Sequence, residues 1–242
     1  MQLIQFFILR FTPVIVAALL ILPANAALAQ DLHHATIQPQ LVDLDLTINY
    51  FYREMRSDGV ILESRYQEKM LRRNNHVWTH RVIPESITNS KVQTSHEHKE
   101  FNYTVLPRLV KFNNGNTSVD YVDLHEHQLI HIPATEFNNV NFDGSWLNTY
   151  YLVNPKIVAA MPLSKRVSKI ANAQWHETEN KGIFQRVLWD YKSAIPLIIE
   201  SGNQSGIFYQ RVEVKNEAGL QTNLPWHKLQ EFSQKEYSDF LD

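Results

Sequence analysis

The stretch Gly182–Val214, GIFQRVLWDYKSAIPLIIESGNQSGIFYQRVEV, contains three short runs of strand-forming residues separated by turn residues. In the first run, Ile183–Trp189, aliphatic and aromatic side chains alternate between two faces. After a polar break, Leu197–Glu200 forms the second run and Ile207–Val214 the third. The connection Gly202–Gly206 is rich in Gly and Asn, which adopt positive φ at low cost. The stretch therefore predicts an antiparallel three-stranded meander.

The same alternation recurs upstream, with hairpin turns at Asn74-Asn75 and Asn113–Asn116. It predicts further strands over Val60–Arg73, His76–Ile83, His96–Val105, Leu109–Phe112, Ser118–Val122, Leu129–Pro133 and Arg166–His176. A turn over Glu177–Gly182 then leads into the meander. The sequence thus favours a mainly β fold with one antiparallel sheet.

Three segments depart from strand spacing. Apolar residues between Gln40 and Arg56 recur every three or four positions, which predicts an amphipathic N-terminal helix, although Leu44–Tyr52 also fits a strand. In mid-chain, a short helix is expected around Trp146, and Asn154-Pro155 is an N-cap followed by a first-turn proline, which predicts a second over Lys156–Met161. The tail from Pro225 is expected to be a docked, partly helical extension.

The N-terminal residues have the pattern of a secretory signal peptide. A leader with Arg10 precedes the apolar run Val14–Leu22, and two A-x-A sites follow, ending at Ala26 and Ala29. Because Arg10 and Pro13 interrupt the apolar stretch, an uncleaved membrane anchor is the weaker alternative. We therefore expect residues 1–29 to be cleaved and residues 30–242 to form one domain in the periplasm.

Composition limits the possible functions. The 242 residues have a formal net charge of −2 with mixed charges, so no basic stripe indicates nucleic-acid binding. The chain contains no cysteine, which excludes disulfides, thiol catalysis and thiolate metal sites. No G-x-S-x-G motif, glycine-rich phosphate loop or paired carboxylates are present, so the sequence predicts a protein that is not an enzyme and needs no cofactor.

Histidine is the unusual residue, with eleven in the chain. Two H-E-H triplets contain His96 with His98 and His125 with His127. On a strand such pairs share a face and can converge on Zn or Cu. His76 and His80 form a second-choice pair with the same parity. The competing interpretation is that these histidines are ordinary polar residues that bind no metal. The second triplet fits a hairpin tip, and the first lies in a charged segment.

Aromatic residues lie on or beside the predicted strands. A packed core explains most of them; the alternative is a concave sheet whose inner face, closed by the helices, holds an apolar ligand. The residues expected to contact such a ligand are Trp78, Phe101, Tyr103, Trp146, Tyr150 and Trp189.

The order of these elements resembles the LolA/LolB-type lipoprotein carrier superfamily, which includes outer-membrane lipoprotein-sorting proteins. The similar segment reads L-W-D-Y-x-x-x-I-P-L-x-x-E-S-x-x-x-x-G. Its residues are Leu188, Trp189, Asp190, Tyr191, Ile195, Pro196, Leu197, Glu200, Ser201 and Gly206. Looser similarity covers Arg65-Tyr66, Arg72-Arg73 and Val77-Trp78 in the first strands, and the hairpin with Tyr121–Asp123 and Leu129–Ile132.

This resemblance implies an incomplete, strongly curved β-barrel with helices as a lid over an apolar cavity. It also implies that the protein carries or senses an acyl chain, a lipid or a lipidated protein without catalysis. Two other hypotheses stay open at this point. One is a periplasmic Zn- or Cu-binding protein that uses the paired histidines. The other is a regulatory module that grips a periplasmic or membrane-complex protein partner through the same groove.

Overall fold

Residues 41–84 and 101–240 are described by the structure, a computed structural model, and they contain one sheet of eleven strands. The strands are β1 (Leu44–Met55), β2 (Ile61–Arg73), β3 (His76–Val82), β4 (Arg108–Asn113), β5 (Asn116–Asp123), β6 (Gln128–Ile132), β7 (Ala173–Asn180), β8 (Ile183–Asp190), β9 (Ile195–Asn203), β10 (Phe208–Asn216) and β11 (Ser233–Glu236). The helices are α2 (Trp146–Tyr151), α3 (Pro155–Ala160) and the 3-10 helices η1 (Ala134–Val140), η2 (Pro225–Glu231) and η3 (Tyr237–Phe240).

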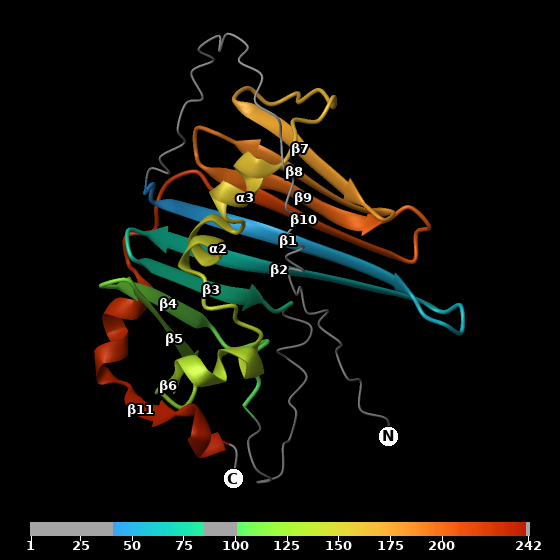
Figure 1. Cartoon of the computed structure of the whole chain (residues 1–242). Helices are drawn as coiled ribbons and strands as arrows, with labels where there is room; N and C mark the ends of the chain where they lie inside the picture. The colour runs from blue at the N-terminus through green and yellow to red at the C-terminus, as the bar shows by residue number, and fades with distance from the viewer. Residues whose placement is uncertain (1–40, 85–100, 241–242) are drawn as a thin grey trace, which may run out of the picture. The chain divides into compact units, whose positions relative to one another are not determined.

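The sheet is curved and open. Its order is β11-β6-β5-β4-β3-β2-β1-β10-β9-β8-β7, so β1 lies in the interior and pairs with both β2 and β10 (Figure 1). Neighbouring strands pair antiparallel, except that β11 runs parallel to β6. Within the described residues the two end strands, β11 and β7, do not pair, and the barrel is therefore incomplete. The mainly β fold with one curved sheet is confirmed.

The meander predicted from Gly182–Val214 is confirmed as β8, β9 and β10. Its turns use residues with positive φ, including Gly206 at 74° and Ala194 at 50°. A β-bulge between Leu188 and Trp189 shifts the register of β8 against β9. Bulges increase local twist and re-aim side chains. Here the bulge leaves both Leu188 and Trp189 buried.

The N-terminal helix predicted over Gln40–Arg56 is wrong, because Leu44–Met55 forms β1. The same segment also contains an alternating apolar set: Leu44, Leu46 and Ile48 are all buried on one face. Both neighbours of β1 supply ladder hydrogen bonds over most of its length. This tertiary pairing decides between two periodicities that the local sequence fits almost equally.

Two strand predictions need smaller corrections. The strand expected over Arg166–His176 begins only at Ala173 and continues through most of the expected turn, to Asn180. Thr178 and Asn180 find partners in β8, so a locally polar segment becomes strand. Of the strand expected over His96–Val105, residues 96–100 lie outside the described residues, and residues 101–105 form no strand. The remaining predicted strands, the mid-chain helices and the docked, partly helical tail are confirmed.

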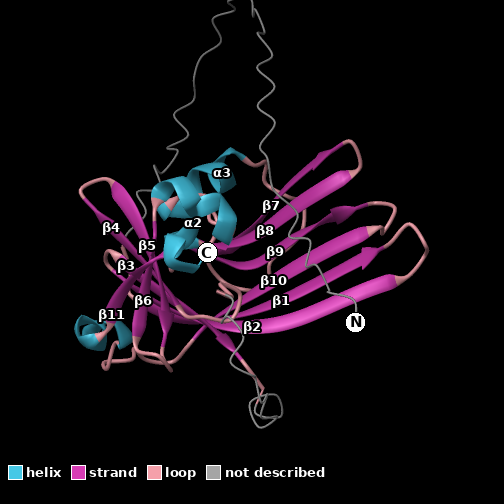
Figure 2. Cartoon of the chain, turned by 90° about the horizontal axis from the view of Figure 1, so that it is seen from below, coloured by secondary structure: helices cyan, strands magenta, loops and turns pink. Residues whose placement is uncertain are grey.

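The sheet has two buried faces. On its concave face, Leu46, Ile48 and Met70 pack with residues of α2 in the main hydrophobic cluster. On its convex face, a second cluster contains Leu71 and Trp78 and is covered by η2. Figure 2 shows α2 and α3 over one half of the concave face, while the strands from β2 to β7 continue beyond them. Among the described residues, no helix is long and apolar enough to cross a bilayer.

Close packing across the meander gives a first testable prediction. A Cβ added to Gly202 would lie 2.8 Å from Cζ of Phe184 and 2.9 Å from the carbonyl oxygen of Phe208. The backbone contact cannot yield as a flexible side chain would, so Gly202→Ala should cost about 1–3 kcal/mol of unfolding free energy. Urea unfolding should show the loss. Gly59→Ala is not a suitable control, because its φ is 82°; the exposed Ser205→Ala in the adjacent turn is suitable. Equal midpoints for Gly202→Ala and Ser205→Ala would contradict the prediction.

Candidate functional site on the concave face

Two short helices cover part of the concave face, and each begins with a side-chain cap. The hydroxyl of Ser145 accepts a hydrogen bond from the backbone N–H of Asn148 at 3.2 Å. The side chain of Asn154 accepts one from Lys156 N–H at 2.9 Å, and Pro155 occupies the first helical position. Each helix has six residues, far fewer than an isolated helix needs in water. Contacts with the sheet must therefore hold this cover in place.

Arg72 provides the central polar contact. It is on β2, fully buried on the concave face. Its Nε donates to Val42 O at 2.9 Å, and its two terminal nitrogens donate to Tyr150 O and Ser193 O, each at 3.1 Å. One guanidinium therefore joins the segment before β1, the C-terminal half of α2 and the β8–β9 turn. The planar, forked donor set of arginine suits such divergent acceptors.

The guanidinium of Arg72 packs against two tyrosine rings. Cζ of Arg72 lies 4.5 Å from the ring centre of Tyr150 and 5.6 Å from that of Tyr151. Burial lowers the pKa of the Arg72 guanidinium, while Tyr150, Tyr151 and Asp43 act in the opposite direction. Arginine stays charged despite burial because its pKa begins so high. Burial also raises the pKa of Tyr150 to about 12, so its hydroxyl stays neutral in any physiological medium.

Sequence reasoning missed Arg72 as a site residue. The available signal was its parity: Arg72 follows Met70 on the side of β2 that carries apolar side chains. A cation on a core-facing position of a strand needs partners, which mark it as a structural or functional centre. The partners themselves come from three distant segments and were not visible in the sequence.

An aromatic layer lies between the cover and the sheet. Trp146 stacks on Phe112 of β4 with ring centres 5.3 Å apart, and it contacts Tyr150 at 5.2 Å. Tyr150 is fully buried, and Trp189 of β8 is 1% exposed. Three of the six predicted ligand contacts, Trp146, Tyr150 and Trp189, thus belong to one cluster. In this structure their rings pack against other side chains of the chain.

The other three predicted contacts are placed differently. Phe101 and Tyr103 pack on the same cluster around Tyr121, with ring centres at 5.4 and 6.4 Å. Phe101 also contacts Tyr237 of the tail at 5.3 Å. Trp78 belongs to the convex-face cluster, on the opposite side of the sheet. The six residues therefore do not form a single site, because Trp78 cannot face a ligand held by the others.

Beyond the cover, the concave face stays partly apolar. Tyr50 of β1 and Tyr66 of β2 stack with ring centres 4.5 Å apart, and both are half-buried. Burial is the main cause that raises the pKa of Tyr66 to about 12. Leu197 and Ile199 of β9 are half-buried and pack against the same main cluster. An apolar strip therefore runs from beneath α2 toward the open half of the concave face.

The paired histidines do not converge within the described residues. His125 and His127 lie in the β5–β6 turn, not on a strand; His125 pairs with Glu126 at 2.7 Å, and His127 packs on Phe232. The strand geometry assumed for this H-E-H triplet is thus wrong. His76 stacks on Trp226, and Nδ1 of His80 accepts the indole N–H of Trp78 at 3.3 Å. His96 and His98 lie outside the described residues.

No group of three His, Asp or Glu side chains in residues 41–84 and 101–240 is arranged to hold a metal ion. Two surface hollows do occur, with volumes of about 470 and 320 Å³. Both lie beside the loop that precedes β7, and both are lined by Leu163, Ser164 and Arg166. They are therefore separate from the aromatic layer under α2.

No protein-family model matches the sequence, and no curated protein matches it at a significant level. Solved structures do match. PNGF-II is 13% identical with a TM-score of 0.37, over 82% of this chain and 32% of that one, so this chain spans about a third of its length. A MucA/MucB complex from Pseudomonas aeruginosa is 10% identical with a TM-score of 0.35, over 74% and 54% of the two chains.

A LolA superfamily protein from Nitrosomonas europaea also matches, at 11% identity with a TM-score of 0.31, over 76% of this chain and 88% of that one. A LolA-type structure is therefore among those that this chain resembles.

Proposed function

We propose that this protein binds an apolar or amphipathic molecule, such as an acyl chain, a lipid or a lipidated protein, on its concave face, and does so without catalysis. The observation that carries the proposal is the apolar strip that runs from Trp189 and Tyr150 under α2 to Leu197 and Ile199 beyond it. Because the rings under α2 pack closely, a ligand would enter at the open half and displace the short helices as it moves inward.

The physical basis is an apolar face that two short helices cover only in part. Acyl chains gain affinity from apolar area removed from water. Neutral tyrosines such as Tyr66 offer apolar rings and a polar edge, which suits an amphipathic ligand. The proposed location is the periplasm, with residues 1–29 cleaved as a signal peptide. Partners would then be lipids or lipidated proteins, or a membrane-complex protein that presents them.

The first experiment is native mass spectrometry of the protein isolated from its own compartment, followed by lipid extraction. A bound mass that extracts as lipid would support the proposal. Titration with a fluorescent fatty-acid probe then locates the site. Ile199→Glu places a charge on the concave strip, whereas Ile198→Glu places it one residue away on the convex face of the same strand. Both wild-type side chains are half-buried, so the pair is matched.

Ile199→Glu should weaken probe binding about tenfold or more, because the carboxylate must be desolvated against the ligand. Ile198→Glu should bind like the wild type. Circular dichroism checks that both variants fold, and Ile199→Gln replaces Ile199→Glu if the charge prevents folding. Equal effects of the two glutamates on affinity, or the absence of any probe binding by the wild type, would refute the concave site.

A further inference from the structure

The loop Pro162–Asn172, between α3 and β7, exposes an unusual set of side chains. Leu163 is 64% exposed, Val167 88% and Ile170 50%. A single exposed aliphatic residue is ordinary on a protein surface. Three within one short loop form a local apolar surface that the described part of the chain leaves uncovered. The function proposed for the concave face does not use this surface.

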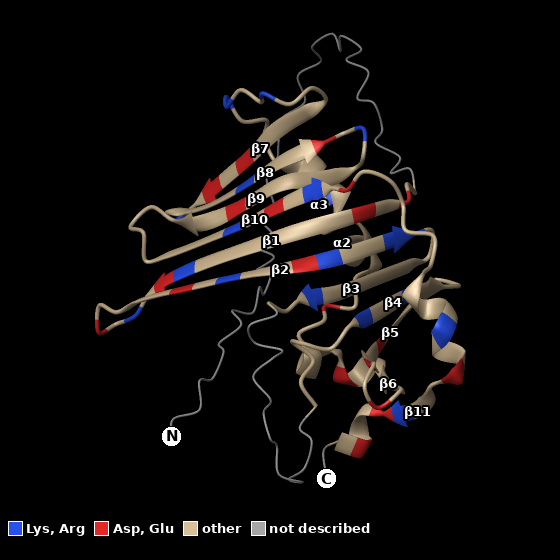
Figure 3. Cartoon of the chain, turned by 180° about the vertical axis from the view of Figure 1, so that it is seen from behind, with Lys and Arg blue, Asp and Glu red and all other residues tan. Residues whose placement is uncertain are grey.

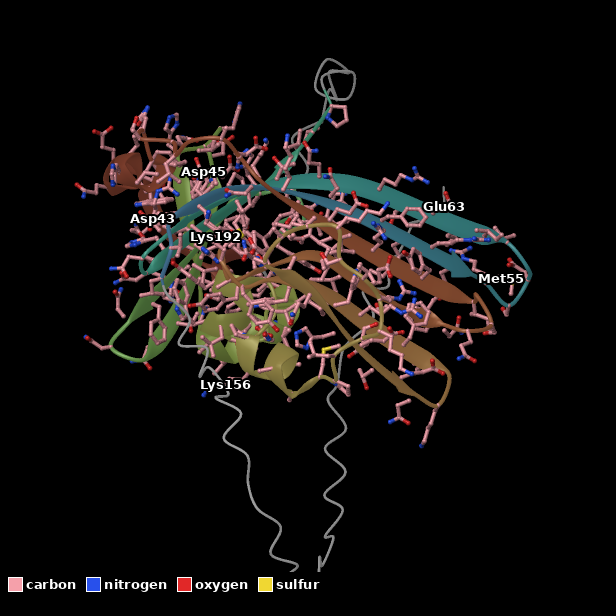
Figure 4. All side chains as sticks on the ribbon, turned by 90° about the horizontal axis from the view of Figure 1, so that it is seen from above. Asp43, Asp45, Met55, Glu63, Lys156 and Lys192 are labelled. Carbon is pink, nitrogen blue, oxygen red and sulfur yellow. The ribbon has the colours of Figure 1, made fainter. Side chains whose placement is uncertain are left out.

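The same loop is cationic. Lys165, Arg166 and Lys169 alternate with the exposed aliphatic residues, and no Asp or Glu occurs between Met161 and His176. Figure 3 shows this as blue segments on the loop before β7. Arg166 forms ion pairs with two carboxylates: its Nε lies 3.6 Å from Oε2 of Glu177, and its Nη1 lies 4.0 Å from Oε2 of Glu200. Lys165 and Lys169 are exposed and have no ion pair with another described residue.

Hydrogen bonds fix the base of the loop. The N–H of Ser164 donates to Trp175 O at 2.8 Å, and its hydroxyl donates to Glu177 at 2.8 Å. Near the other end, Ile170 N–H donates to the hydroxyl of Ser168 at 3.1 Å. Beside the loop lies the hollow of about 470 Å³, with Lys165 and Arg166 among its lining residues. The loop thus presents apolar and cationic side chains together. Because its base is already fixed, binding should cost little further loop entropy.

We propose that the loop Pro162–Asn172 is a membrane-docking surface for an anionic lipid bilayer. Val167, Ile170 and Leu163 would enter the boundary between headgroups and acyl chains, while Lys165 and Lys169 meet lipid phosphates. Apolar side chains interleaved with Lys and Arg are the composition of interfacial membrane binders. A protein partner fits less well, because the cores of protein–protein interfaces are depleted in lysine.

The test is co-sedimentation of the protein with vesicles of phosphatidylglycerol and phosphatidylethanolamine, compared with vesicles of phosphatidylcholine. Three variants are compared with the wild type, all with the same N-terminus. Lys165→Glu with Lys169→Glu removes the charge, and Val167→Ser with Ile170→Ser removes the apolar surface. Lys215→Glu with Leu220→Ser is the matched control, since Lys215 is exposed and Leu220 is 49% exposed elsewhere on the molecule.

We expect binding to the anionic vesicles only, weakened about tenfold or more by either loop variant, because each basic residue near an anionic surface and each buried aliphatic group adds to affinity. The control variant should bind like the wild type, and high salt should weaken wild-type binding. Unchanged binding by the loop variants, equal binding to phosphatidylcholine, or no binding to anionic vesicles would each overturn the proposal. All substitutions are at exposed positions, and circular dichroism verifies that each variant folds.

Discussion

Arg72→Met should destabilise the fold by about 3 kcal/mol or more and loosen α2 before the rest of the sheet. Methionine fills much of the space but donates no hydrogen bond, so the carbonyls of Val42, Tyr150 and Ser193 lose a shared donor. Val42 O keeps the Tyr150 hydroxyl as a donor at 3.3 Å, whereas Tyr150 O and Ser193 O lose the donor that Arg72 gave them. A buried acceptor left without a partner costs about 1–3 kcal/mol. Urea unfolding gives the total, and hydrogen exchange over residues 146–160 reports the local opening.

Two further variants distinguish the hydrogen bonds from charge and volume. Arg72→Lys keeps the charge but cannot satisfy three divergent carbonyls, and should recover only a small part of the loss. Arg65→Met is the control on the same strand, because the Arg65 side chain is 73% exposed and its ion pair with Glu63 spans 3.5 Å. Exposed pairs of this kind contribute about 0–1 kcal/mol. Similar losses for Arg72→Met and Arg65→Met would contradict the role assigned to Arg72.

The meander was predictable because its signals are local. Alternation in Ile183–Trp189 and Ile207–Val214, with turn residues between, leaves few other structures possible. The helices were predictable for a similar reason, since Asn154-Pro155 caps a helix whatever surrounds it. In both cases the residues that determine the element are within a few positions of one another.

The secondary structure of β1 could not be predicted from local sequence. Ile48 lies opposite Val214 of β10, far away in the sequence, and this pairing makes a strand of a segment that also has helical spacing. Trp78 illustrates a related limit. Trp78 and Val77 lie on opposite faces of β3, as neighbouring strand residues do, but this alternation does not say which face is concave. That depends on η2, a tail segment that packs against Trp78 from the other end of the chain.

The strand geometry expected for His125 and His127 is wrong for a geometric reason. An i, i+2 pair shares a face only in extended backbone, and His127 has φ of 52° in the β5–β6 turn. The polar sequence Asp123–Gln128 already favoured a turn, and the structure agrees with that alternative. Arg72 is the opposite case: its sequence position was known, but three partners from separate segments give it its role.

Trp189→Ala should destabilise the protein by about 3–5 kcal/mol, because Trp189 is 1% exposed and lies in the main cluster. Trp175 is the matched control. It is on the adjacent strand, half-buried on the convex face, where Arg166 lies over its ring at 5.7 Å. Its replacement by alanine removes the same number of atoms but leaves no enclosed space, and should cost less than half as much. The two variants are compared by their urea unfolding midpoints, with the slope of unfolding free energy against urea concentration expected to stay unchanged.

The space left by Trp189→Ala also tests whether the aromatic layer under α2 can hold a small apolar molecule. Cavities lined by apolar side chains stay dry and bind small apolar molecules. Added indole should therefore raise the melting temperature of Trp189→Ala, since a ligand that binds only the folded state stabilises it by mass action. Indole should leave Trp175→Ala unchanged. Failure of indole to rescue Trp189→Ala, with the variant still folded, would mean that the layer collapses rather than opens. The apolar strip would then be core alone, and the ligand would have to bind entirely on the open half of the sheet, around Ile199.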